Sequence, residues 1–493
     1  MSSEKDSYRQ IFKATSIFGG LQVFNILISV LKSKIVAVLL GPAGLGLISI
    51  FNSTVSLISS CTDFGIGTSA VKSVASTNQN ENKISQSTII AVVKKLVWVT
   101  GILACTITIV LSPMLSKISF GDYSYTISFS LLGIALLALQ INNGQIAILQ
   151  GLREIKLVAL SSLLGASFGF VISLPLYYFF GQDGIVPSII LTSLLAALTS
   201  WYFLKRKHIG AIKVDMITLK NDGIEIVKLG FLISLTAIFP AIVAYIVRIF
   251  ISNIGTIEDV GFYTAGFSII GTYVGMIFTA MSTDYYPSLA EVSDDNLKCN
   301  EKVNQQILVC ILVLSPLLIT MLVFLKIGII ILYTVDFLGT VKMIQWACLG
   351  IFFQAFSFCI AYLFLAKRDS KVYFWNELIP NFYTLIFNCI AYYIWGLEGL
   401  GISFLIAYIF YFIQVYIIAK KRYGFTMQIS TVRLSLFQFI IAVLTFALVY
   451  IVEASFVTYV LGIVFILISS ITSIIQLNKK IPFMNKINFK KRQ

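Results

Sequence analysis

The sequence predicts an all-α polytopic membrane protein with about 14 transmembrane helices. Three observations support this fold class. Of the 493 residues, 58% are apolar and only 12% are charged, long apolar stretches recur along the chain, and short motifs repeat at one constant spacing. Soluble proteins carry about 25% charged residues, and the mean hydropathy here is +0.91. These values exclude a disordered protein, a secreted disulfide scaffold and an ordinary cytosolic enzyme.

A transmembrane helix needs about 20 mostly apolar residues, and fourteen stretches meet this requirement. They lie at 15–40, 44–70, 88–111, 126–150, 157–180, 185–204, 226–252, 261–283, 304–326, 341–366, 372–395, 400–419, 433–452 and 456–476. None shows the alternating polarity of a membrane β-barrel strand. Only residues 453–455 separate the last two stretches, so thirteen helices are the alternative. The polar segment Met1–Lys13 predicts no cleavable signal peptide.

The distribution of positive charge predicts the orientation in the membrane. With both termini in the cytoplasm, 28 of the 36 Lys and Arg residues fall on the inner side, and only Lys117 and Lys342 fall in outer loops. Cytoplasmic loops of membrane proteins carry such an excess. The asymmetry explains the net charge of +14 without nucleic acid. The basic tail, Lys479–Arg492, is expected to lie against anionic membrane lipids.

An internal repeat indicates a duplicated chain. One constant shift along the sequence carries Tyr177–Gly184 onto Tyr392–Gly399, Arg153–Lys156 onto Arg368–Lys371, and Gly46 onto Gly261. We call this shift the repeat offset. Helix 1 then maps onto helix 7, so the two copies cross the bilayer in the same direction. Such copies are related by a pseudo-twofold axis along the membrane normal.

The repeat also predicts the domain organisation. Residues 1–206 form an N-terminal six-helix lobe, 207–222 a cytoplasmic linker, and 223–420 a C-terminal six-helix lobe. Residues 421–493 add helices 13 and 14 and the basic cytoplasmic tail, outside the repeat.

Three basic residues inside predicted helices are candidate substrate-binding residues. A charge at the centre of a membrane helix costs about 2.5–3.5 kcal/mol on insertion scales, so it indicates function by default. Lys32 and Lys34 lie in helix 1, and the repeat places Arg248 of helix 7 at Ser33, between them. Cations at one pseudo-symmetric depth would attract an anion such as a phosphate, which Arg grips with a bidentate fork. The alternative is that they reach the outer headgroups.

Two acidic residues and one proline have open alternatives. For Asp63 the sequence leaves three roles open: it binds a coupling cation, it pairs with a lysine, or it caps a helix break at Gly65. Glu377, in helix 11, is a second intramembrane carboxylate. Pro240, which precedes Arg248 in helix 7, is placed as a hinge, although a static kink has the same sequence signature.

Helix 4 contains an amide-rich stretch whose side chains are candidate sugar contacts. They are Gln140, Asn142, Asn143 and Gln145. Amides can hydrogen-bond to sugar hydroxyls, and they also hold membrane helices together. The sequence leaves both roles open.

Signals for metals, cofactors and enzymatic catalysis are weak. His208 is the single histidine, so the chain has no histidine-built metal site and no His-centred triad. The seven cysteines form no CxxC pair and are read as buried free thiols. No phosphate-binding GxxxxGK[ST] motif is present. We therefore expect no enzyme, no metal and no cofactor.

Several motifs resemble one family of membrane transporters. Leu40–Leu47, Asp63–Gly67 and Phe278–Pro287 are similar to segments of polysaccharide flippases of the O-antigen translocase type, as are two shorter strings, Gln150–Arg153 and Gly181–Ile185. The resemblance covers helices 1 to 12. It implies membership of the multidrug/oligosaccharidyl-lipid/polysaccharide exporter superfamily, with two six-helix lobes that form a V-shaped central cavity and work by alternating access.

The resemblance also implies a substrate and a site. The substrate would be an undecaprenyl-diphosphate-linked oligosaccharide, an O-antigen repeat unit or a similar glycan, moved from the cytoplasmic to the periplasmic leaflet of a bacterial inner membrane. Its partners would be membrane lipids and other polysaccharide-assembly proteins. The family's cationic cavity would correspond here to Arg248 and, more loosely, to Lys32 and Lys34. Counter-flow of Na⁺ or H⁺ is the family expectation, for which Asp63 is our candidate.

Two alternatives remain open. A cation-coupled multidrug exporter of the same superfamily would favour acidic groups in its cavity, whereas basic candidates outnumber acidic ones here. A membrane glycosyltransferase or polysaccharide polymerase would need catalytic acids and a larger outer loop, and the sequence shows neither.

Overall fold

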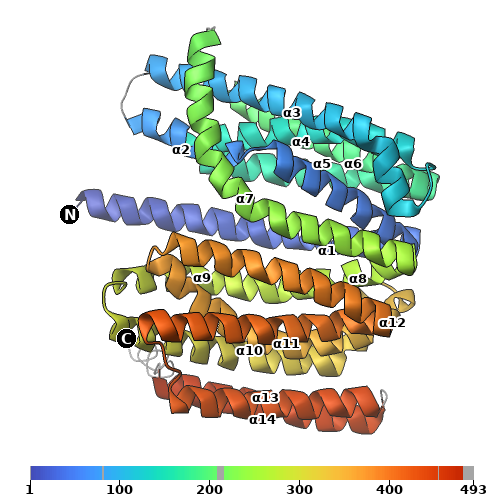
Figure 1. Cartoon of the computed structure of the whole chain (residues 1–493), viewed down its shortest axis with the longest axis vertical. Coiled ribbons are helices and arrows are strands. Elements are labelled where there is room, and N and C mark those ends of the chain that lie inside the picture. Colours follow the sequence, from blue (N-terminus) through green and yellow to red (C-terminus); the bar gives the residue numbers. More distant parts are fainter. Residues whose placement is uncertain (1, 80–82, 208–215, 453–454, 481–493) are drawn as a thin grey trace, which may run out of the picture. The chain divides into compact units, whose positions relative to one another are not determined.

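A computed structural model describes residues 2–79, 83–207, 216–452 and 455–480. Within these ranges the regular structure is entirely helical, which confirms the all-α class (Figure 1). The single histidine, His208, most of the predicted linker and the tail beyond Lys480 lie outside the described residues. Helices suit a lipid environment because each satisfies its own backbone hydrogen bonds.

The helices pack into two compact units, Met1–Gly261 and Phe262–Gln493. The first unit contains α1 (Ser2–Thr62), α2 (Ile66–Gln79), α3 (Lys83–Phe120), α4 (Thr126–Gly151), α5 (Ile155–Phe180), η1 (Gly181–Gly184), α6 (Ile185–Lys205), α7 (Met216–Ile254) and the start of α8 (Ile257–Ile269). The second contains the rest of α8, η2 (Ile270–Val274), α9 (Gly275–Glu291), α10 (Asn296–Leu332), η3 (Val335–Thr340), α11 (Val341–Ala366), α12 (Ser370–Tyr423), α13 (Ile429–Ile451) and α14 (Phe456–Lys480).

The packing within each unit explains where the boundary falls. In the first unit α4 packs against α2, α3 and α6, and α7 packs against α1, α2 and α3. In the second unit α11 packs against α12, while α13 and α14 pack against α10. The division into compact units therefore places α7 with the N-terminal helices, because its contacts are with them. The predicted lobes follow the sequence duplication instead, and they remain a prediction.

The predicted count of fourteen spans is not confirmed. The described residues contain eleven helical runs long and apolar enough to cross a membrane, judged by length and composition. Three of these runs, Phe24–Thr62, Ile155–Lys205 and Ser370–Tyr423, each contain two predicted helices. Helix α1 runs through Gly41 (φ 63°, ψ −167°), and α12 runs through Gly396 (φ 59°, ψ −141°). At each point two helical segments meet at one residue with non-helical angles and no loop between them, so one run holds two predicted helices.

The backbone supports the internal repeat. Gly181 (φ 55°, ψ −128°) turns the chain as Gly396 does, and the repeat offset carries one onto the other. Arg153 and Arg368, which the same offset relates, both have positive φ, at 60° and 56°. Positive φ is uncommon in residues other than glycine. The recurrence of two such conformations at one offset indicates that both copies keep the same local fold.

An ion pair recurs at the same offset. Lys207 pairs with Glu154 in the first unit, and Arg422 pairs with Asp369 in the second. The partners are 53 residues apart in both pairs. Each pair joins the turn before one helix to the C-terminal end of the next helix segment. The sequence comparison had matched the acidic members but not their basic partners.

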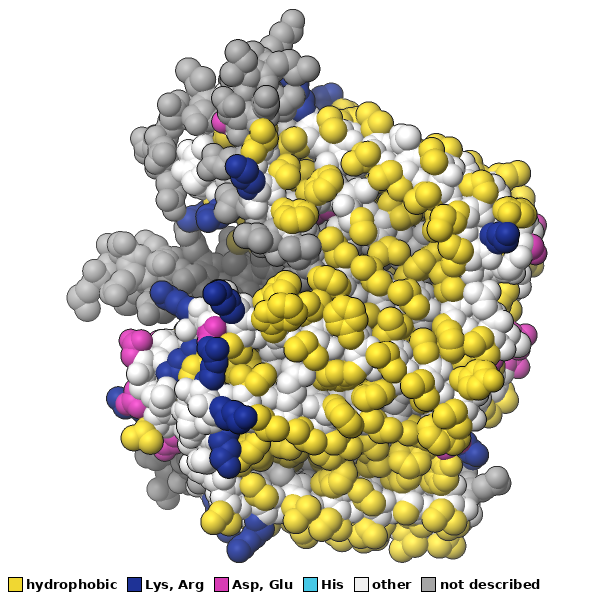
Figure 2. Space-filling model, in the orientation of Figure 1, with side chains coloured by type: hydrophobic (Ala, Val, Ile, Leu, Met, Phe, Trp, Pro, Cys, Tyr) yellow, Lys and Arg dark blue, Asp and Glu magenta, His cyan; other side chains and the backbone are white. Residues whose placement is uncertain are grey.

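The surface of each unit fits a lipid solvent. Figure 2 shows apolar side chains over the sides of the helices on the visible face, with Lys and Arg gathered near one end of the helices in each unit. A core of buried apolar side chains joins α2, α3, α4 and α6, including Ile66, Val74, Ile90, Val93 and Leu149. Apolar packing inside and apolar contact with lipid outside support a multi-pass membrane protein.

Candidate functional site

Arg248 is a half-buried cation that joins α7 to α1. Its Nε donates to Ser49 Oγ at 2.7 Å, and its Nη1 donates to the carbonyl oxygen of Ala244 at 2.7 Å. Ser49 is only 6% exposed. The guanidinium is thus oriented by a buried hydroxyl and a helix carbonyl. An arginine fixed in this way is pre-organised to bind a planar or tetrahedral anion.

Lys32 and Lys34 lie on α1, before the turn at Gly41, and both are half-buried. Lys32 forms no hydrogen bond or ion pair with any residue that the structure describes. A half-buried ammonium without a carboxylate partner is costly in an apolar setting, so an anionic ligand would relieve the cost. That these lysines and Arg248 share one site remains a prediction.

Two glycines bring repeat-related turns into direct backbone contact within the first unit. A Cβ atom added at Gly46 would collide with the carbonyl oxygen of Ile257, and one added at Gly261 would collide with that of Pro42. The repeat offset carries Gly46 onto Gly261, and it also carries Pro42 onto Ile257. The contact is therefore reciprocal, as expected across a twofold axis. It is tight enough that only glycine fits at either position.

The amide side chains of α4 have different surroundings. Gln140 is 1% exposed, and its Nε2 lies 3.4 Å from Ser59 O, Ser59 Oγ and Thr62 Oγ1 of α1. This is the interhelical role that the sequence left open. Gln145 accepts a hydrogen bond from Ser200 Oγ of α6 at 2.5 Å. Asn142 and Asn143 are half-buried.

Asp63 lies in the short break between α1 and α2. Its carboxylate accepts hydrogen bonds from the backbone N–H groups of Gly65 and Gly67. Phe64 (φ 47°) and Gly65 (φ 67°) both have positive φ there. Asp63 therefore caps the start of α2, which is one of its three sequence-based alternatives. Its proposed part in ion coupling would have to act through this cap.

Pro240 lies inside α7, which continues from Met216 to Ile254. Figure 1 shows that α7 bends along its length. A proline removes one backbone hydrogen bond and permits such a bend. Arg248 follows on the same helix, so a change in the bend would move the guanidinium. The hinge role remains a prediction.

Glu377 stands out in the second unit. It lines a cavity of about 290 Å³ with side chains of α11 and α12. Its Oε1 accepts a hydrogen bond from Tyr411 Oη at 3.1 Å, and Tyr411 in turn accepts one from Asn376 Nδ2 at 3.1 Å. Gln354 lines the same cavity, and its Oε1 is buried without a hydrogen-bond partner among the described residues. The sequence marked Glu377 and offered Gln354 as a further amide for sugar contact, but it did not indicate that Gln354 and Tyr411 lie near Glu377, because they come from distant segments of the chain.

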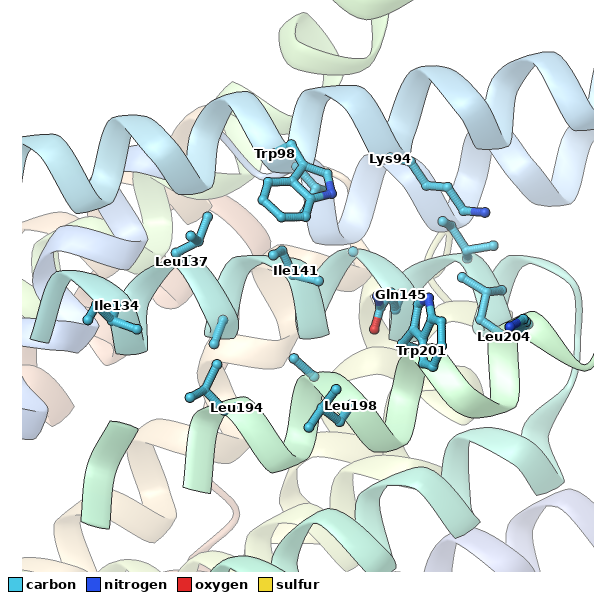
Figure 3. A pocket seen from close by; sticks show the side chains of 16 residues that line it. Lys94, Trp98, Ile134, Leu137, Ile141, Gln145, Leu194, Leu198, Trp201 and Leu204 are labelled. Carbon is cyan, nitrogen blue, oxygen red and sulfur yellow. The ribbon is translucent and has the colours of Figure 1, made fainter. Parts of the chain in front are cut away.

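A second, larger cavity of about 650 Å³ lies among α3, α4 and α6 of the first unit. Figure 3 shows Lys94, Gln145, Trp201 and Leu204 at one end and Ile134 and Leu194 at the other. Within the described part of the chain, no group of three or more His, Cys, Asp or Glu side chains could hold a metal ion.

Comparison with known proteins agrees with this fold. Residues 35–342 match the model of the family described as "Polysaccharide biosynthesis protein". The "Lipid III flippase" of Escherichia coli (strain K12) is 20% identical over 385 residues, which are 78% of this chain and 91% of that protein.

Two solved structures share the fold. "Lipid II flippase MurJ, inward closed conformation" gives a TM-score of 0.71 at 12% identity, over 95% of this chain and 99% of that chain. An inward-facing "multidrug resistance MATE family transporter of the MOP superfamily" gives 0.65 at 16% identity, over 82% and 94%. All of these relatives are named as flippases or transporters, not enzymes. The family model covers more than half of the sequence, and the chain belongs to the polysaccharide biosynthesis protein family, with the fold of the MOP superfamily.

Proposed function

We propose that this protein is a flippase for an undecaprenyl-diphosphate-linked oligosaccharide, an O-antigen repeat unit or a similar glycan. It carries the sugar head from the cytoplasmic to the periplasmic leaflet of a bacterial inner membrane, with both termini in the cytoplasm. A diphosphate and its sugars cannot cross about 30 Å of hydrocarbon unaided. Cations inside the protein replace the water that the diphosphate loses.

The proposal rests on the fixed position of Arg248 in an apolar helix. An arginine in an apolar helix is expensive, and here it is held in place by Ser49 and Ala244. It follows Pro240 on α7 and is hydrogen-bonded to Ser49, which follows Gly46 on α1, so a conformational change at either helix can move it. We assign Arg248 to the diphosphate, with Lys32 and Lys34 as further cations. Asn142, Asn143 and Gln145 are assigned to the sugars.

Alternating access follows from thermodynamics if the two conformations bind the lipid head with different affinity. An ion gradient can drive the cycle if Na⁺ or H⁺ binds one conformation better. Asp63 is our proposed coupling residue, and Glu377 is the alternative because it faces a cavity. Cation-coupled drug export is the second candidate function, because the fold is MATE-like and the Glu377 carboxylate faces a cavity.

The test is export by the reconstituted protein. A fluorescent lipid-diphosphate oligosaccharide is placed in liposomes, and its leaflet is followed by quenching from outside. Arg248→Gln should slow transfer by about ten- to a hundred-fold, because a charge-assisted hydrogen bond is worth about 1.5–3 kcal/mol. Arg248→Lys should retain part of the rate, because it keeps the charge but not the fork.

A matched control separates this role from general loss of charge. Lys326 is another half-buried basic residue in a long apolar helix, α10. Lys326→Gln should transport at the wild-type rate. If Arg248→Gln transports normally, or if Lys326→Gln loses as much activity, the assignment of Arg248 is wrong.

A further inference from the structure

A cavity of about 650 Å³ lies among α3, α4 and α6, and Gln145 is its only lining residue that the proposed function uses. Its lining residues include two lysines, Lys94 and Lys205, two tryptophans, Trp98 and Trp201, and no acidic residue. Its floor is formed by α4, whose Gln145 is hydrogen-bonded to Ser200 of α6. Most of the remaining lining is aliphatic. The cavity is thus an apolar trough with positive charge among its walls.

The two lysines come from different helices and remain accessible. Lys94 belongs to α3 and Lys205 to the last turn of α6, and both are exposed. Lys94 forms no hydrogen bond or ion pair with any part of the chain that the structure describes. Lys205 Nζ lies 5.0 Å from the centre of the Trp201 ring, a cation–π contact that leaves the charge uncompensated. The neighbouring acid, Glu154, is paired with Lys207 instead.

The tryptophans give the trough the character of a membrane interface. Trp98 is 52% exposed and Trp201 is 49% exposed. Such half-exposed indoles mark the level of the lipid headgroups. Figure 3 shows Lys94 and Trp201 toward the same end of the trough, while Ile134, Leu137 and Leu194 extend away from it. A ligand lying here would have its charge at the interface and its hydrocarbon along α4.

From these features we infer that the trough is a binding site for one anionic phospholipid of the cytoplasmic leaflet. The phosphate group lies between Lys94 and Lys205, and one acyl chain lies along α4. Basic pockets between helices on the cytoplasmic side suit such headgroups. The volume is that of a site for one ligand of moderate size. A polyprenyl chain, which is far longer than an acyl chain, fits it less well.

Lipid binding in the trough can be measured without transport. The full-length protein is placed in nanodiscs of phosphatidylcholine, and phosphatidylglycerol with brominated acyl chains is titrated in. Bromine quenches nearby tryptophans, so Trp98 and Trp201 report the chain directly. The chain has five tryptophans, and a Trp98→Phe/Trp201→Phe variant gives the signal of the other three.

The expected result is quenching that saturates at a low fraction of phosphatidylglycerol. Each lysine near the surface strengthens binding about five-fold, so Lys94→Gln/Lys205→Gln should raise the half-saturating fraction about 25-fold. The matched control is Lys156→Gln, which removes an exposed charge from the start of α5 outside the trough. It should leave the curve unchanged. Ile141→Phe, which fills the trough and keeps both lysines, should also weaken quenching.

Two measurements on the unmodified protein keep the inference testable if a variant fails to fold. Unbrominated phosphatidylglycerol should restore the fluorescence, and unbrominated phosphatidylcholine should not. Equal quenching by brominated phosphatidylcholine would show ordinary surrounding lipid and overturn the inference. Stronger displacement by a polyprenyl diphosphate would assign the trough to the transported lipid and also overturn it. A wild-type curve from the double lysine variant would do the same.

Discussion

The reciprocal glycine contact predicts a measurable shift between conformations. Gly46→Ala places a Cβ atom against the carbonyl oxygen of Ile257, which is backbone and cannot rotate away. Overpacking of this kind costs about 1–3 kcal/mol. If the turns separate during transport, that cost falls only on the conformation in which they touch. The ratio of touching to separated molecules should then fall about five- to 150-fold.

Spin labels can measure this shift. Cysteines at Asn52 of α1 and Glu258 of α8, both exposed, lie near the two sides of the contact. The seven native cysteines are first replaced by serine. Double electron–electron resonance should show a short distance for the parent protein and a larger population of longer distances for Gly46→Ala.

The equivalent glycine of the repeat gives a second variant, and a glycine elsewhere in a helix gives a control. Gly261→Ala collides with Pro42 O in the same way, so it should shift the distances in the same direction and by a similar amount. Gly328→Ala, in α10, meets no atom within 4 Å and should change nothing. An unaltered distance distribution in both Gly46→Ala and Gly261→Ala would refute the reasoning, as would an equal shift in Gly328→Ala.

Three further predictions concern side chains with defined partners. Partial burial raises the pKa of Asp369, but hydrogen bonds from Val372 N–H, Tyr423 and Arg422 outweigh it and hold the pKa below its usual value. The pair should therefore contribute stability at neutral pH that is lost as the pH falls below about 4. The melting temperature should fall between pH 6 and pH 3, and it should fall slightly less in Asp369→Asn than in the wild-type protein. The difference is small because the pair is partly exposed. An equal fall in the two proteins would contradict this. Gln140→Leu should lower the free energy of unfolding by about 1–2 kcal/mol while transport per folded molecule is kept; loss of transport in stable protein would make Gln140 a sugar contact. Asp63→Asn should weaken the dependence of transport on the ion gradient, and a loss confined to Glu377→Gln would move the coupling site to the second unit.

Much of the fold could be predicted from periodic and compositional features. The apolar stretches predicted the helices because lipid demands continuous hydrophobic length. The constant spacing of the repeated motifs predicted equivalent turns, and Gly181 and Gly396 have nearly the same backbone angles. Helix boundaries were less predictable, because one residue such as Gly41 can end one helix and begin the next without a loop.

The side-chain partners could not be predicted in the same way. Whether an amide faces a neighbouring helix or a cavity depends on how the helix is rotated, so Gln140 and Gln145 could not be told apart from sequence. The ion pairs join residues 53 apart, which no local pattern reveals. Their signal was nevertheless present, because the repeat offset that carries Glu154 onto Asp369 also carries Lys207 onto Arg422. A comparison of the charged residues at this offset would have identified both ion pairs.

In the proposed function, the protein recognises and moves a phosphate charge on the lipid. The most direct measurement compares two fluorescent lipids in liposomes containing the wild-type protein. Both carry the same oligosaccharide and the same polyprenyl chain, one through a diphosphate and the other through an uncharged linkage. The diphosphate lipid should be transferred rapidly, and the neutral lipid should be transferred no faster than in protein-free liposomes. Equal rates for the two lipids would contradict it.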